Sequence, residues 1–147
     1  MPRLAKPEEA PVLRALVRDA YAHYMARLDR EPAPMTDDYA ARIAAGQAWI
    51  EEQDGTPVGV LVLEDTEDGL MLDNIAVSSA QRGRGHGRRL MDFVEAEARR
   101  RGHRRIWLYT NEKMVENIAM YTRLGYAETH RAEQAGHRRV FMEKHLA

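Results

Sequence analysis

Glycine and arginine alternate in one short stretch of this chain, which has the composition of an anion-binding loop. Residues 81–89 read Gln-Arg-Gly-Arg-Gly-His-Gly-Arg-Arg. Because Gly83, Gly85 and Gly87 lack a β-carbon, they allow positive φ angles and a close approach of a ligand to the backbone. A helix that begins after such a loop presents unpaired N–H groups and the positive end of its dipole. The chemistry predicted for this stretch is therefore phosphate binding.

The elements on either side of the loop are predicted from hydrophobic spacing. An apolar run at 70–77 precedes it, and Leu90, Val94 and Ala98 recur every four residues after it. The first pattern indicates a strand and the second one face of a helix. Residues 106–110 indicate another strand. A strand, a helix and a strand in this order predict a right-handed crossover between two parallel strands.

The first forty-six residues predict helices joined by a stiff loop. Apolar side chains recur every three or four residues between 13 and 24, which is typical of a helix with one buried face. Pro32 and Pro34 predict a loop over 31–34, because proline lacks an amide donor and biases the preceding residue toward extended geometry. Thr36 or Asp37 is then expected to cap a second, short helix.

The remaining segments predict two hairpins and a further helix. Residues 48–53 and 57–64 form the first hairpin, and the second of these strands is apolar without alternation, so both of its faces should be buried. Residues 115–124 predict a short helix that ends at a glycine. Residues 126–135 and 137–144 predict a closing hairpin.

The composition indicates one soluble domain. The chain has 147 residues, 44% of them apolar and 31% charged, with a net charge of −1 and no cysteine. The lack of cysteine excludes disulfides, thiolate nucleophiles and thiolate metal sites. The six histidines show no close ligand spacing, so no metal site is expected. No segment resembles a signal region or a membrane span, and we expect a cytoplasmic protein that binds no membrane.

Two common phosphate motifs do not fit the loop. No Gly-Lys-Ser or Gly-Lys-Thr follows the glycines, and Arg88 stands where a dinucleotide-binding loop needs glycine. The pattern Arg82-x-x-Gly85-x-Gly87, together with Asn117, Tyr121 and Gly125-Tyr126 downstream, resembles the GNAT superfamily of acyl-CoA-dependent N-acetyltransferases. The resemblance covers almost the whole chain.

The resemblance implies a fold and a reaction. The expected fold is α/β: a single domain, 1–147, with a mixed, twisted sheet of about six to seven strands, about four flanking helices and splayed central parallel strands. The expected cofactor is acetyl-CoA, or coenzyme A after the reaction. The expected reaction is direct transfer of an acetyl group to an amine in a ternary complex, since a chain without cysteine cannot form a cysteine-acyl intermediate.

The resemblance also implies which residues contact the cofactor and act in catalysis. Backbone amides of the loop would hold the pyrophosphate, and the preceding strand would pair with the pantetheine arm and polarise the thioester carbonyl. The expected cofactor contacts are Ile75, Ala76, Val77, Arg82, Gly83, Arg84, Gly85, His86, Gly87, Arg88, Asn117 and Tyr121. Tyr121 would be the general acid. Asn117 and Tyr121 are four residues apart, so they share one helix face.

The general base and the acceptor are less defined by the sequence. Asp73 is the nearest carboxylate on the central strand, and it could act either as the base or in a structural or substrate-orienting role. Met71 stands where some family members carry a catalytic glutamate, so the sequence does not assign the base. The acceptor, a small-molecule or peptide amine, is expected to enter a pocket built by the first two helices. Its candidate lining residues are Tyr21, Tyr24, Met35 and Tyr39. A homodimer is compatible with the resemblance, since dimers are common in the family.

Two other functions compete with this interpretation. Residues 82–89 and 99–105 contain clustered arginines and could form a nucleic-acid-binding surface, although the net charge of −1 argues against nucleic acid as a partner. A family member that binds acyl-CoA as a sensor, without turnover, is the other alternative. The side chain of His86 is expected to be a solvated part of the loop.

Overall fold

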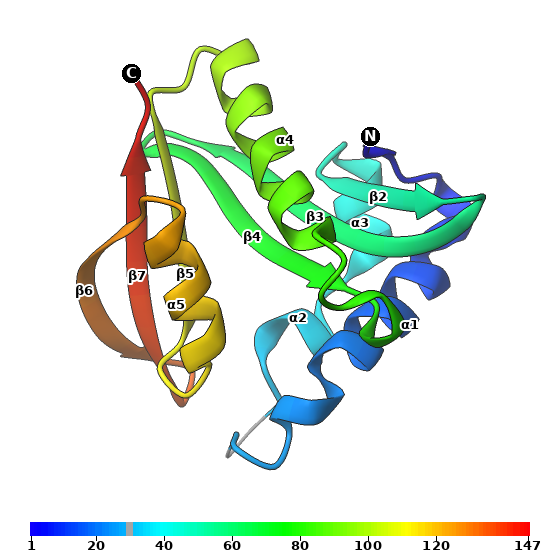
Figure 1. Ribbon diagram of the computed structural model, residues 1–147, viewed down its shortest axis with the longest axis horizontal. Coiled ribbons are helices and arrows are strands. Elements are labelled where there is room, and N and C mark those ends of the chain that lie inside the picture. Colours follow the sequence, from blue (N-terminus) through cyan, green and yellow to red (C-terminus); the bar gives the residue numbers. More distant parts are fainter. Residues whose placement is uncertain (29–30) are drawn as a thin grey trace.

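A 7-stranded mixed sheet with helices on both faces forms the protein (Figure 1). The computed structural model describes residues 1–28 and 31–147. The strand order is β1-β2-β3-β4-β5-β7-β6. The strands are β1 (Arg3–Leu4), β2 (Ala48–Gln53), β3 (Thr56–Thr66), β4 (Gly69–Val77), β5 (Arg105–Asn111), β6 (Ala127–Gln134) and β7 (His137–His145). The α-helices of the described residues are α1 (Ala10–Tyr21), α2 (Ala33–Thr36), α3 (Tyr39–Ala44), α4 (His86–Arg100) and α5 (Val115–Arg123). The predicted α/β class and mixed sheet are confirmed.

Strand β3 carries the core on both of its faces, as its unbroken apolar run predicts. Val60 and Val62 pack in a cluster with α1 and α3, whereas Leu61 and Leu63 pack with α4. All four are fully buried. The sheet is therefore covered by α1 and α3 on one face and by α4 and α5 on the other.

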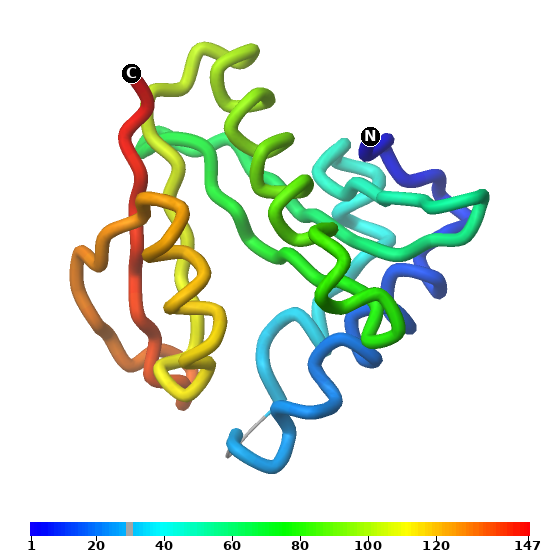
Figure 2. Tube along the Cα trace, in the orientation of Figure 1, coloured from blue at the N-terminus to red at the C-terminus, as the bar shows by residue number. Residues whose placement is uncertain are grey.

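The two central strands are parallel and diverge. Strands β4 and β5 pair only at Leu70 with Ile106 and at Met71 with Trp107. Beyond Met71, the edge of β4 that faces β5 has no strand partner among the described residues. Figures 1 and 2 show the resulting V, with β1–β4 on one arm and β5–β7 with α5 on the other. The predicted splay of the parallel pair is confirmed.

A β-bulge at Asp73 accompanies this divergence. Leu63 pairs with Leu72 and Val62 pairs with Asn74, so Asp73 has no opposite residue on β3. Leu72 consequently faces the α4 cluster, whereas Asn74, two residues later, contacts Tyr21 of α1. On a regular strand both would face the same side. The bulge thus exchanges the residues of β4 that face α1 and α3 with those that face α4 and α5. Bulges also bend the strand that carries them.

The proline-rich segment differs from its prediction. Residues 33–36 form helix α2, with Pro34 in the first turn. Proline is tolerated there because the amides of the first turn have no partner within the helix. The cap of α3 is neither Thr36 nor Asp37: the carboxylate of Asp38 accepts from the amide of Ala41 at 3.1 Å. The predicted loop and cap were therefore wrong by a few residues, because short helices leave little periodic signal.

Candidate active site

The glycine loop between β4 and α4 has the left-handed backbone that its composition allows, at two of its three glycines. Gly83 and Gly85 have φ angles of 78° and 80°, in the left-handed region that favours glycine. Gly85 is also the N-cap of α4, and no side chain caps this end of the helix. Gly87 lies inside the first turn of α4 and does not have a positive φ angle.

An outer cavity of about 510 Å³ opens over this loop, beside the free edge of β4. Three groups of residues line it: the end of β4, the glycine loop, and the facing sides of α1, η2 (Ala22–Tyr24) and α5. The lining includes two arginines outside the loop, Arg88 of α4 and Arg123 of α5. Of the predicted cofactor contacts, those that line this cavity are Ile75, Ala76, Val77, Arg82, Gly83, Gly85, His86, Gly87, Arg88 and Asn117.

Two arginines of the loop have structural contacts. A guanidinium nitrogen of Arg82 donates to the carbonyl of Ala20 at 2.5 Å and so ties the loop to the C-terminal turn of α1. Arg84 is exposed, and its carbonyl accepts from the guanidinium of Arg89 at 3.3 Å. Arg84 therefore contributes to the loop through its backbone, and sequence reasoning missed Arg89 as its support.

His86 is buried, and the prediction of a solvated side chain was wrong. Its exposed fraction is 4%. Its Nε2 lies 2.9 Å from Oε1 of Gln53 on β2, and its Nδ1 lies 2.8 Å from the guanidinium of Arg89. A guanidinium only donates, so Nδ1 accepts and Nε2 carries the proton that is donated to Gln53. The imidazole thereby joins the start of α4 to the first hairpin.

A narrower inner cavity of about 50 Å³ lies deeper between the diverging strands. Its lining includes Asp73 of β4, Tyr109 of β5, Arg139 of β7 and Tyr121 of α5. The residues that line both cavities are Tyr21, Ile75, Met114 and Asn117. The two cavities therefore adjoin, and a ligand that extends past Ile75 reaches from one into the other.

Tyr121 and Asn117 both line the inner cavity, as expected for residues on one face of α5. Tyr121 is only 5% exposed, and its ring lies 5.9 Å from that of Tyr126. Burial raises the pKa of the Tyr121 phenol, so this group keeps its proton at neutral pH. The lining of the inner cavity therefore includes a phenol that is protonated at neutral pH.

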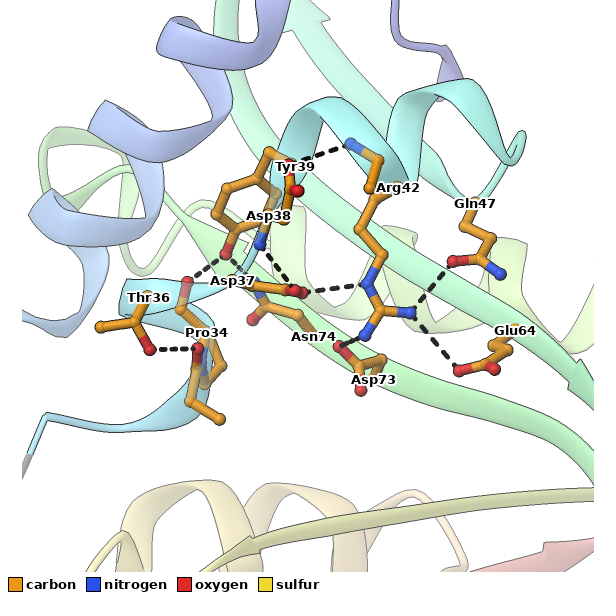
Figure 3. A network of polar contacts seen from close by, with 12 residues as sticks. Pro34, Thr36, Asp37, Asp38, Tyr39, Arg42, Gln47, Glu64, Asp73 and Asn74 are labelled. Atoms are coloured by element: carbon orange, nitrogen blue, oxygen red, sulfur yellow. Dashed lines mark hydrogen bonds and ion pairs between the residues drawn. The ribbon is translucent and has the colours of Figure 1, made fainter.

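Asp73 belongs to a network of polar contacts centred on Arg42 (Figure 3). The Arg42 guanidinium lies 3.2 Å from Asp73, 3.0 Å from Asp37 and 3.4 Å from Glu64. Burial raises the pKa of the Asp73 carboxyl, and the positive charge of Arg42 opposes that rise. Sequence reasoning missed Arg42, because a lone arginine on a short helix has no distinguishing pattern.

The four candidate acceptor residues fall in different places. Tyr21 lines both cavities and donates to Oδ1 of the buried Asn74 at 3.2 Å. Tyr24 lines the outer cavity and does not line the inner one. Met35 and Tyr39 lie in the core with α1, so their prediction as lining residues was wrong. Tyr39 still supports the wall, because its hydroxyl accepts from Asn74 at 3.2 Å and donates to the carbonyl of Pro34.

The second arginine cluster is engaged in ion pairs. Arg100 and Arg101 each lie 2.7 Å from the carboxylate of Glu97, and Arg105 lies 2.5 Å from that of Glu143. These contacts neutralise much of the charge that a nucleic-acid-binding surface would need. Within residues 1–28 and 31–147, no helix has the length and apolar character to cross a membrane, and no cluster of His, Asp and Glu is placed to hold a metal ion.

Comparison with known proteins identifies relatives of the chain. The model of the acetyltransferase (GNAT) family matches residues 12–126. The chain is 32% identical over 108 residues to N-alpha-acetyltransferase 80 of Mus musculus, and the match covers 74% of this chain and 29% of that protein. It is 29% identical over 141 residues to N-acetyltransferase family 8 member 2 of Rattus norvegicus, and this match covers 91% of this chain and 59% of that protein. The chain thus spans less than two thirds of the length of either relative.

A solved structure has the same fold. The PaiA N-acetyltransferase of Thermoplasma acidophilum, in complex with coenzyme A, superposes with a TM-score of 0.82. The match covers 99% of this chain and 98% of the other, at 15% sequence identity. A likeness at 15% sequence identity shows that the two proteins share a fold, and it shows the fold alone.

Proposed function

This chain belongs to the GNAT family of acetyltransferases, and from that membership we propose that it transfers an acetyl group from acetyl-CoA directly to an amine. The observation that carries the proposal is the meeting of the two cavities at Ile75 and Asn117, within the opening between β4 and β5. The outer cavity has the size of a small-molecule site, and the inner one has an acid and a carboxylate in its lining. Both substrates would be held together, since the chain has no cysteine to carry an acyl group.

The glycine loop and the first turn of α4 would hold the pyrophosphate of the cofactor. Gly83 and Gly85 have no β-carbon and adopt a left-handed backbone, and α4 is a helix of 15 residues whose N-terminal amides lack a side-chain cap. Such amides and the positive end of the helix dipole favour an anion. The guanidinium groups of Arg88 and Arg123 add positive charge to the same cavity.

The unpaired edge of β4 would hold the pantetheine arm. Ile75, Ala76 and Val77 line the outer cavity where β5 has diverged. Backbone groups on that edge can pair with an extended ligand as they would with a strand. One of these amides would donate to the thioester oxygen, where negative charge develops during transfer.

Tyr121 would be the general acid and Asn117 would orient the cofactor. The bound thioester supplies the acyl group: a C–N bond forms to the amine while the C–S bond breaks. The thiolate that leaves needs a proton, and the protonated, buried phenol of Tyr121 lies in the cavity where it can supply one.

Asp73 is our candidate for the group that removes the proton of the attacking amine. It lies in the lining of the inner cavity, and its burial raises its pKa, which makes the carboxylate a stronger base than an exposed aspartate. The bulge frees it from pairing with β3, and Arg42 holds its orientation. A water between Asp73 and the amine would serve equally well as the path of the proton.

Cofactor binding separates this function from nucleic-acid binding. Calorimetric titrations with coenzyme A and with a random oligonucleotide at physiological salt should give binding with the first only. Tight binding of the oligonucleotide with no heat from coenzyme A would contradict the proposal.

A further inference from the structure

One arginine, Arg139, lines the inner cavity, and another, Arg42, pairs with Asp73 in that lining. Of the two, only Arg42 has carboxylate partners among the described residues. Arg42 has three carboxylates within ion-pair distance, those of Asp37, Glu64 and Asp73. Arg139 lines the cavity from β7, and in the described part of the chain no carboxylate lies within ion-pair distance of it. The positive charge of Arg139 is therefore available to a ligand.

The side chain of Arg139 is held in place by uncharged groups. Its guanidinium stacks over the ring of Tyr109, 4.2 Å from the centroid, and donates to Oε1 of Gln134 at 2.9 Å. Tyr109 also lines the inner cavity. A cation–π contact and one amide hydrogen bond fix the position of the guanidinium, give it no ion-pair partner and leave its other N–H groups available. The arrangement is that of a prepared anion site.

Asp73 and Arg139 thus give the inner cavity a carboxylate on β4 and an unpaired guanidinium on β7. The two strands lie on opposite arms of the split sheet (Figure 1). A guanidinium binds carboxylates well because its planar N–H groups match the two carboxylate oxygens. A simple alkylamine would use only one side of this cavity.

On the basis of the transferase function proposed above, we infer that the acceptor is an amine that also carries a carboxylate, and that Arg139 binds this carboxylate. The amine would then point toward Asp73 and Tyr121. Free amino acids and peptide N-termini with a nearby acidic side chain share this chemistry. Arg139 is a specificity-determining residue in this account, since it contacts the acceptor away from the reacting atoms.

Matched acceptor pairs test the inference. Each pair differs only in the carboxylate: an amino acid against its primary amide, and a peptide with an acidic second residue against the same peptide with the corresponding amide residue. Thiol release from acetyl-CoA gives kcat/KM for each. The carboxylate member should be favoured by about tenfold or more, the factor that one charge-assisted hydrogen bond supplies. The pair with the larger preference identifies which source of the carboxylate the cavity takes.

The variant Arg139→Glu should abolish or invert this preference, measured as the ratio of kcat/KM for the two members of each pair. Arg138→Glu is the matched control. Arg138 is the preceding residue of β7, its side chain is 74% exposed, and it pairs with Glu112 instead of lining the inner cavity. This control should keep the wild-type preference. If Arg139→Glu fails to fold, as judged by its melting curve, Arg139→Gln carries the same test.

The outcomes distinguish this inference from the proposed function. A wild-type enzyme that acetylates amines without regard to the carboxylate, or an Arg139→Glu variant that keeps the preference, contradicts the inference alone. An enzyme without turnover on any amine contradicts the proposed function. In that case titration of the coenzyme A-loaded protein with both members of each pair still decides the inference, because weaker binding of the amide member supports it and equal binding overturns it.

Discussion

The guanidinium of Arg42 lies 3.2 Å from the carboxylate of Asp73 and joins helix α3 to the bulge in β4. The positive charge of Arg42 lowers the pKa of Asp73, against the effect of burial, which raises it. Removal of Arg42 must therefore raise this pKa further. If the ionised carboxylate accepts the proton of the amine, activity needs a higher pH once Arg42 is gone.

We expect Arg42→Gln to move the acid limb of kcat/KM upward by about one pH unit, the lower end of the effect of a neighbouring opposite charge. Arg105→Gln is the control, because Arg105 pairs with Glu143 and lines neither of the two cavities. The pH profile of each variant checks this. An acid limb that stays in place in Arg42→Gln would remove Asp73 from the proton path.

Tyr121→Phe removes the hydroxyl that we propose as the general acid and preserves the ring. We expect kcat to fall at least tenfold, since a positioned acid contributes about 10²- to 10⁴-fold, and coenzyme A affinity to stay nearly unchanged. Tyr126→Phe is the control, because Tyr126 is a buried neighbour whose hydroxyl has no partner among the described residues. Equal kcat values for the wild type and Tyr121→Phe would exclude Tyr121 as the acid.

Gly85→Ala and Gly102→Ala form a pair at the two ends of α4. Their φ angles are 80° and 81°, so each alanine should cost about 1–2 kcal/mol of folding free energy. Only Gly85 lies at the proposed pyrophosphate site. We expect coenzyme A to bind roughly tenfold more weakly to Gly85→Ala, a loss of about 1.4 kcal/mol, and normally to Gly102→Ala. Equal affinities in calorimetry would place the pyrophosphate elsewhere.

Glu97 makes the stability of the protein depend on pH. Hydrogen bonds from Arg100 and Arg101 lower the pKa of this buried carboxyl from 4.5 to about 2. Its contribution is thus present above the unfolded-state pKa and lost as the pH falls through the folded-state value. We expect Glu97→Gln to lower the free energy of unfolding at pH 7 by about 1–3 kcal/mol. Urea denaturation at several pH values checks this, and a deficit that persists undiminished near pH 2 would contradict it.

The fold was predictable because its strongest signals are local. The apolar run of β3, the spacing of Leu90, Val94 and Ala98, and the glycine loop each report their element without tertiary information. The crossover rule then makes β4 and β5 parallel. The prediction that these strands diverge came from the family resemblance. The bulge at Asp73 that accompanies the divergence has no signature in the sequence.

The site was predictable only in part, because some contacts join segments far apart in the chain. The network of Arg42 with Asp37, Glu64 and Asp73 combines α3, β3 and β4. His86 is buried because Gln53 of the first hairpin meets the start of α4. Such pairings depend on tertiary packing, so periodicity and spacing do not report them.

Acyl transfer to an amine is the central claim, and release of coenzyme A thiol is its most direct measurement. A thiol reagent has no background from this cysteine-free chain. With acetyl-CoA and a panel of amines that includes amino acids, polyamines, aminoglycosides and peptide N-termini, we expect thiol release that depends on the amine and falls at least tenfold in Tyr121→Phe. Binding of acetyl-CoA with no amine-dependent release across the panel would contradict the account and indicate a sensor.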